Sequence, residues 1–281
     1  MSPYESCPRG LPSPLFGEEL GFTLLELVVV LVVLGIMAAL TTGIILNPIR
    51  AYEDQARRAQ LVAEADTALT RMVRELRQAL PNSVRVAGGG QYLEFIPTVD
   101  GGRYRAAQDP NNAAIEDILD FTQSDSSFDV VGGLQTGQAQ AGDAVVIYNT
   151  TATGPVTNAY RGDNREAITT VGSRIQLAAA KRFPHPSLIA QRFEVVPSSG
   201  PVTFYCNNGQ LRRHTGYGYA VNQPTGFTGE GSLLAEHVSV CQMDYVAGNQ
   251  ERSGVVTLRL GLSDQGESIT LLYQAHVINA P

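Results

Sequence analysis

The chain has 281 residues, of which 43% are hydrophobic and 17% are charged. This length and composition suffice for one sizeable core or two small ones, and they exclude a disordered or fibrous protein. The formal net charge of -7 at pH 7 comes without a basic tail, so a nucleic-acid partner is disfavoured and none is predicted.

An apolar run begins near the amino terminus and extends from Phe22 to Leu46. As a helix it spans about 37 Å, which is enough to cross a hydrocarbon core of about 30 Å. The run is too long for a secretory leader, and no small-residue cleavage site follows it. We therefore predict a membrane helix, with any cleavage in front of it.

One acidic residue, Glu26, lies inside this run. A carboxylate in the membrane interior costs at least about 2.5 kcal/mol on insertion scales, so it needs a partner. Cleavage between Gly21 and Phe22 would supply one, because the new α-amino group of Phe22, in the same or a neighbouring subunit, is a cation at a similar depth. The alternative is a glutamate near the helix end whose carboxylate reaches the interface.

The order Gly21, Phe22, Thr23, Leu24, Leu25 and Glu26 before an apolar helix resembles the processing site of type IV prepilins and of type II secretion pseudopilins. The resemblance implies that a prepilin peptidase removes residues 1–21 and methylates the amine of Phe22. It also implies that the helix of residues 22–48 packs in a filament core, with Glu26 serving subunit assembly.

The predicted leader departs from this family in its charge. Glu18 and Glu19 precede the cut and Arg9 is the only cation of the leader, so the positive-inside rule is weakly satisfied. The orientation, with the chain in the inner membrane and its head in the periplasm before assembly at the cell surface, follows from the resemblance alone.

A second helical segment is predicted over residues 49–80, after Pro48, which removes a backbone donor and should kink or loosen the helix. Acid-first pairs at i, i+4 are expected for Glu53 with Arg57 and for Asp54 with Arg58, on a solvated or subunit-facing surface. Apolar residues at three- and four-residue steps predict a face that packs on a globular head. They are Val62, Leu69, Met72, Val73, Leu76 and Leu80.

The remaining residues, 81–281, are predicted to form one mostly antiparallel β head, which makes the fold class α+β. Alternating patterns over 256–262 and 269–277 predict two adjacent strands joined by a turn around Gln265. Asn208 and Gly209 predict a hairpin between 201–206 and 210–214. Further strands are expected at 92–96, 143–149, 174–179 and 192–196. The glycine-containing segments 88–90, 101–102 and 216–231 are interpreted as loops.

Segments of the head sharpen the resemblance. Residues 80–86, 234–245 and 254–281 resemble those of the MshO family of MSHA-pilus minor pilins, which is related to the J-type pseudopilins of type II secretion. This implies a minor pilin that primes pilus assembly or lies near the tip, with other pilins as partners. The alternatives are a minor pseudopilin of a secretion machine and a ligand-binding pilin, either an adhesin or a DNA-capture subunit.

Three cysteines are present, and Cys7 falls in the predicted leader. The remaining two, Cys206 and Cys241, are expected to form a disulfide if the head reaches an oxidising compartment, with a stabilisation of about 3 to 4 kcal/mol. The alternative is two separate buried thiols.

No catalytic motif emerges, so we predict neither an enzyme nor a cofactor. A structural or exposed role is expected for the four histidines, which lack metal-ligand spacing. They are His185, His214, His237 and His276. Four acids could in principle gather around calcium, but they lack EF-hand spacing, so no metal is predicted. They are Asp117, Asp120, Asp125 and Asp129.

Overall fold

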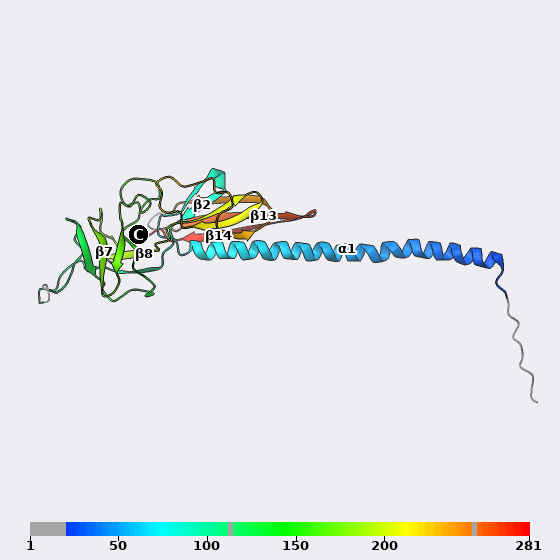
Figure 1. The fold of residues 1–281 in the computed structure, drawn as a ribbon, viewed down its shortest axis with the longest axis horizontal. Coiled ribbons are helices and arrows are strands. Elements are labelled where there is room, and N and C mark those ends of the chain that lie inside the picture. Colours follow the sequence, from blue (N-terminus) through cyan, green and yellow to red (C-terminus); the bar gives the residue numbers. More distant parts are fainter. Residues whose placement is uncertain (1–20, 112–114, 249–251) are drawn as a thin grey trace, which may run out of the picture. The chain divides into compact units, whose positions relative to one another are not determined.

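The structure, a computed structural model, describes residues 21–111, 115–248 and 252–281 (Figure 1). It divides into two compact units, Met1–Glu53 and Asp54–Pro281, each described by itself. The fold is α+β, with one long apolar-to-amphipathic helix and antiparallel sheets. The first 20 residues, which make up nearly all of the predicted leader, lie outside the described residues.

The long helix, α1, extends from Leu24 to Leu76 and continues through Pro48. Its end is four residues earlier than the predicted Leu80. Proline disfavours a helical conformation for the residue before it, and Pro81 follows Leu80. The chain leaves the helix soon enough for the Leu80 N–H to donate to the Ile96 carbonyl oxygen at 2.7 Å.

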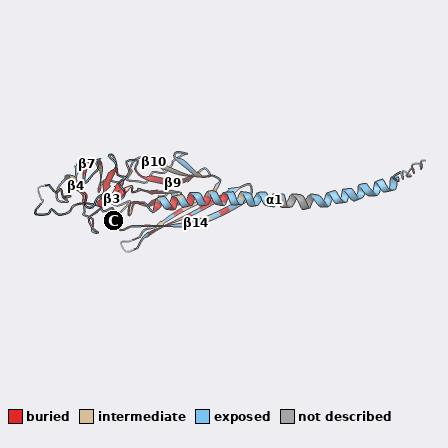
Figure 2. Ribbon diagram, turned by 90° about the horizontal axis from the view of Figure 1, so that it is seen from below, coloured by how far each residue is buried: buried red, intermediate tan, exposed pale blue. Residues whose placement is uncertain are grey.

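Within the second unit, one face of α1 is buried between two antiparallel sheets (Figure 2). The five-stranded sheet has the order β1-β2-β9-β10-β11. Its strands are β1 (Arg85–Ala87), β2 (Tyr92–Phe95), β9 (Val202–Asn207), β10 (Gln210–Thr215) and β11 (Ser232–Ala235). The three-stranded sheet contains β12 (Val238–Val246), β13 (Gly254–Asp264) and β14 (Glu267–Val277). A 3-10 turn, η1 (Gly88–Gly90), links β1 and β2.

The buried face of α1 differs in part from the predicted one. Leu69, Met72, Val73 and Leu76 are buried as expected, whereas Val62 is 38% exposed. The buried positions at the start of the face are Leu61, Ala65 and Ala68. Alanines allow the sheets to approach the helix closely, and their weak hydrophobicity explains why the pattern of large apolar residues misplaced the face by one position.

A six-stranded sheet is inserted between β2 and β9 and forms a lobe with its own core, which we call the inserted lobe. Its order is β3-β8-β5-β6-β7-β4. The strands are β3 (Asp100–Arg103), β4 (Asp125–Asp129), β5 (Ala144–Val146), β6 (Arg165–Thr170), β7 (Arg174–Lys181) and β8 (Arg192–Val196). A small cluster that includes Leu80, Ile96, Val146 and Tyr160 joins the lobe to the segment after α1. The head is therefore built around separate cores.

The two predicted hairpins are confirmed. Strands β13 and β14 pair over their whole length, from Gly254 with Val277 to Asp264 with Glu267. Strands β9 and β10 pair around Asn208 and Gly209, whose φ angles of 50° and 71° are those of the predicted tight turn.

One predicted loop is wrong. Gly101 and Gly102 lie in strand β3, where Gly102 pairs with Phe193 of β8. A Cβ atom at Gly102 would lie 2.7 Å from the Phe193 ring. The glycine therefore makes room for a large aromatic neighbour across the strand pair and does not mark a turn.

A buried ion pair stabilises the five-stranded sheet. Arg85 Nε donates to a Glu94 carboxylate oxygen at 2.5 Å, and both side chains are buried. The other Glu94 oxygen accepts from the Tyr217 hydroxyl at 2.8 Å. Burial raises the pKa of Glu94 above its ordinary range even though Arg85 lowers it. Removal of either partner would leave a buried charge without compensation.

Candidate functional site

The predicted cut site lies in exposed chain directly before α1. Residues 21–23 have no regular secondary structure, and a Cβ atom placed on Gly21 would meet no atom within 4 Å. Phe22 is 76% exposed. Exposed segments without regular structure are the usual sites of proteolysis, so the arrangement is compatible with cleavage after Gly21.

Thr23 is the N-cap of α1. Its Oγ1 accepts a hydrogen bond from the Glu26 backbone N–H at 3.2 Å, and its carbonyl oxygen accepts one from the Leu27 N–H, also at 3.2 Å. Glu26 is therefore the third residue of the helix, and Thr-x-x-Glu is the spacing of a capping box. The Thr-x-x-Glu spacing is visible in the sequence, but it is not among the features predicted above.

The Glu26 carboxylate interacts favourably with the amino-terminal end of its own helix. A negative charge in the first turn faces the unpaired N–H groups and the positive end of the helix dipole, which stabilise it by about 0.3 to 1 kcal/mol. This offsets only part of the membrane penalty of at least about 2.5 kcal/mol at mid-bilayer. Before cleavage, the nitrogen of Phe22 is an uncharged amide. The pairing of its free amine with Glu26 therefore stays a prediction.

The apolar part of α1 is exposed throughout its described length. The window Leu24–Thr41 has a mean hydropathy of 2.7, and none of its 18 residues is buried. By length and composition it can cross a membrane. A helix with apolar side chains on all sides is stable only where lipid or protein covers it. A membrane anchor and a signal sequence both have such a segment near the amino terminus.

Charged residues follow on α1, and their pairing differs from the prediction. In place of the expected i, i+4 pairs, Arg57 contacts Asp54 at 3.2 Å and Asp264 at 3.8 Å. Asp264 lies at the turn between β13 and β14, so Arg57 connects the helix to this hairpin. The pair with Asp54 has i, i+3 spacing on the helix, whereas the contact with Asp264 depends on the tertiary fold.

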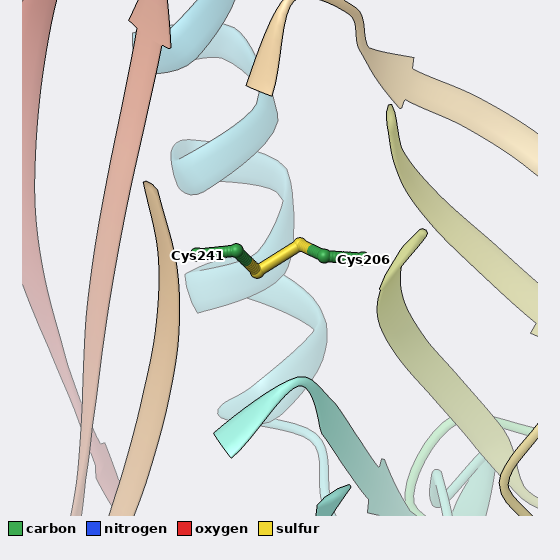
Figure 3. Close-up of a disulfide and its surroundings, with 2 residues drawn as sticks. All are labelled: Cys206 and Cys241. Atoms are coloured by element: carbon green, nitrogen blue, oxygen red, sulfur yellow. A yellow bond between two sulfur atoms is a disulfide. The ribbon is translucent and has the colours of Figure 1, made fainter. Parts of the chain in front are cut away.

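The predicted disulfide between Cys206 and Cys241 is present, with a Cα–Cα distance of 6.4 Å. Cys206 belongs to β9 of the five-stranded sheet and Cys241 to β12 of the three-stranded sheet. Figure 3 shows the bond between these strands, alongside α1. It therefore fastens together the two sheets that enclose the helix.

The four acids weighed as a calcium site serve instead to hold loops. Arg174 Nε lies 2.7 Å from an Asp129 oxygen and 3.4 Å from an Asp117 oxygen, which places a guanidinium where a metal would be needed. An Asp125 oxygen accepts from the Asp120 N–H at 2.9 Å. Across the described ranges, no three histidine, cysteine, aspartate or glutamate side chains are grouped as a metal site.

The histidines are dispersed. His214 stacks on Tyr217, with ring centroids 5.2 Å apart, and His185 makes an edge contact with Tyr148 at 6.2 Å. His237 lies 4.0 Å from Asp264, and His276 is in β14. These contacts place the histidines in separate parts of the head and support structural or surface roles.

Comparison of the chain with protein-family models, with curated proteins and with solved structures found no match. Features of the chain itself therefore indicate its function. They are an exposed glycine before a capped helix, an apolar segment without internal cover, and a disulfide-bonded β head.

Proposed function

We propose that this chain is a type IV pilin-like subunit, made as a precursor that prepilin peptidase cuts between Gly21 and Phe22 and methylates at the Phe22 amine. The observation that supports this proposal most directly is the position of the N-cap. Thr23 starts an apolar helix two residues after an exposed glycine, so cleavage there releases a nearly fully helical amino terminus with Glu26 in its first turn.

The apolar helix then has two successive environments in this proposal. It first anchors the precursor in the inner membrane as a single span, with the head in the periplasm. It later packs against the helices of other pilins in the filament. The exposure of every residue in Leu24–Thr41 supports both roles, and the disulfide of the head suits an oxidising compartment.

Among pilin-like proteins, the proposed role is a minor pilin of an MSHA-type pilus. The chain would take part in assembly or in the structure of the tip. What supports an assembly subunit is a head in which the five-stranded and three-stranded sheets enclose the last part of α1, from Leu61 to Leu76. The helix that enters the filament core thereby continues directly into the core of the head.

A crosslinking experiment tests this proposal. A photoreactive amino acid replaces Leu31, which is 61% exposed in the apolar segment, and the variant is produced as the only copy in a piliated strain. Adducts with other pilins are expected in isolated filaments. The control is the same variant in a strain without prepilin peptidase, where these adducts should be lost. Adducts with lipid alone in both strains would contradict the proposal.

A further inference from the structure

A wide, shallow depression of about 560 Å³ lies on the surface of the inserted lobe, and we call it the cavity. One wall is the loop before β6, which includes Val156, Arg161 and Asp163, and the other begins at the end of β7 with Lys181 and Arg182. Pro155 and Pro184 also line it, one in each wall. Because proline restricts the backbone, both walls are stiffened.

Positive charge accumulates around this cavity. Three cations line it, against a single acid, although the chain as a whole has a net charge of -7 and only one lysine. Arg161 is the one that forms an ion pair, at 3.4 Å from Asp163. Its side chain is 41% exposed, which leaves donor groups of the guanidinium accessible.

In the part of the chain that the structure describes, the other two cations donate hydrogen bonds to carbonyl oxygens. Lys181 Nζ donates to the Gly162 carbonyl at 2.6 Å, and Arg182 Nε donates to the Phe121 carbonyl at 3.3 Å. Asp125 is opposite Lys181 in the β4–β7 pair. Even so, within the described ranges no carboxylate oxygen approaches Lys181 or Arg182 to within 4.0 Å. Neither cation is therefore in an ion pair with a carboxylate of the described residues.

The rim of the cavity has a strained backbone. Val156 and Thr157 have φ angles of 60° and 55°, in the left-handed region that β-branched residues rarely adopt. Hydrogen bonds hold this conformation, because the Thr150 N–H donates to the Thr157 carbonyl at 3.1 Å and the two threonine hydroxyls are 2.5 Å apart. Such strain is concentrated at ligand-binding sites.

We propose that this cavity binds an oxyanion, namely a phosphate or sulfate group, through Arg161, Lys181 and Arg182. An excess of positive charge around a recess concentrates anions, and guanidinium and ammonium groups form charge-assisted hydrogen bonds with phosphate and sulfate oxygens. The group is either a free ion or part of a phosphorylated sugar. Either source gives the head a ligand that is independent of filament assembly.

Calorimetric titration of the full chain in non-ionic detergent, at constant ionic strength, tests the proposal with inorganic phosphate, sulfate and glucose 6-phosphate as probes. Lys181→Gln and Arg182→Gln should each weaken binding about tenfold, the loss of one charge-assisted hydrogen bond. Glutamine keeps an amide donor for the carbonyl contacts. Arg103→Gln is the control, because it removes an exposed arginine from strand β3 of the same lobe.

Tighter binding of glucose 6-phosphate than of inorganic phosphate, lost in the two cavity variants, would support the site and identify a phosphorylated sugar as its source. Equal or tighter binding of the inorganic ions, lost in the same variants, would support a site for the free ion. The proposal is overturned if no probe binds at millimolar concentration, or if Arg103→Gln weakens binding as much as the cavity variants. Circular dichroism of each variant verifies that the fold is retained.

Discussion

Replacement of Glu26 by alanine should impair assembly and leave folding intact. The N-cap bond joins Thr23 Oγ1 to the backbone N–H of residue 26, so it survives the loss of the side chain. The helix loses only the interaction of the carboxylate with its dipole, about 0.3 to 1 kcal/mol. The penalty for the carboxylate in the membrane, at least about 2.5 kcal/mol at mid-bilayer, disappears at the same time. The variant should therefore insert at least as well as the wild type.

In the filament the balance is reversed, because the free amine of Phe22 on a neighbouring subunit would compensate the Glu26 charge. Glu26→Gln keeps the size but loses the charge and should resemble Glu26→Ala, whereas Glu26→Asp should be intermediate because its arm is shorter. Thr23→Ala is the matched control. It should weaken the start of the helix by about 1 kcal/mol while it preserves the carboxylate.

The assay uses strains that carry each variant as the only copy. Protein level, cleavage after Gly21, surface pili and co-purification of other pilins are measured. We expect normal level and cleavage for Glu26→Ala, with reduced pili and partner recovery, and a milder assembly defect for Thr23→Ala. Normal piliation and normal partner recovery with Glu26→Ala would refute the reasoning about this carboxylate.

Three further predictions concern the head. Cys206→Ala removes the disulfide between two residues that are 35 positions apart. It should lower the free energy of unfolding by about 3.8 kcal/mol, which corresponds to a Tm lower by about 8 to 15 °C. An unchanged Tm, compared with the oxidised wild type, would contradict this. Asp100 accepts hydrogen bonds from four backbone N–H groups. Burial raises the pKa of Asp100, but these bonds lower it by more, so Asp100→Asn should destabilise the protein at pH 7 in denaturant titrations. The difference should begin to shrink as the pH falls to about 4, the ordinary pKa of the carboxyl in the unfolded chain, and it should vanish only below the lowered pKa of the folded state. A difference that is constant with pH would count against the role of the charge. Arg85→Met should destabilise the protein by about 3 to 5 kcal/mol because it leaves Glu94 buried without a cation. Adding Glu94→Gln to this variant should restore part of the lost stability. No recovery would mean that the packing of Arg85 matters more than its charge.

Local patterns in the sequence are sufficient to predict the two hairpins and the presence of the long helix. The pairing of β13 with β14 follows from alternation of apolar residues, and the β9–β10 turn follows from the Asn208 and Gly209 pair, since both depend on neighbours in the chain. The disulfide could also be predicted from the sequence, because only two cysteines remain outside the predicted leader.

Long-range packing produced the errors. Strand β3 was missed because its glycines are required by Phe193, which is distant in sequence. Arg57 pairs with Asp264 through the tertiary fold. The inserted lobe could not be anticipated either, because nothing local in β2 or β9 reveals that these adjacent strands enclose a separate sheet. At the amino terminus, by contrast, the Thr-x-x-Glu spacing was sufficient to predict that Thr23 caps the helix.

The central claim is that the chain is a processed pilin-like subunit, and intact-mass analysis of the membrane-extracted protein tests it most directly. In cells with active prepilin peptidase, we expect a chain of 260 residues, 281 less residues 1–21, beginning at Phe22. It should carry one methyl group on the amine and lack two hydrogens because of the disulfide. Persistence of the full-length chain beside an active peptidase, or a first residue other than Phe22, would contradict the account.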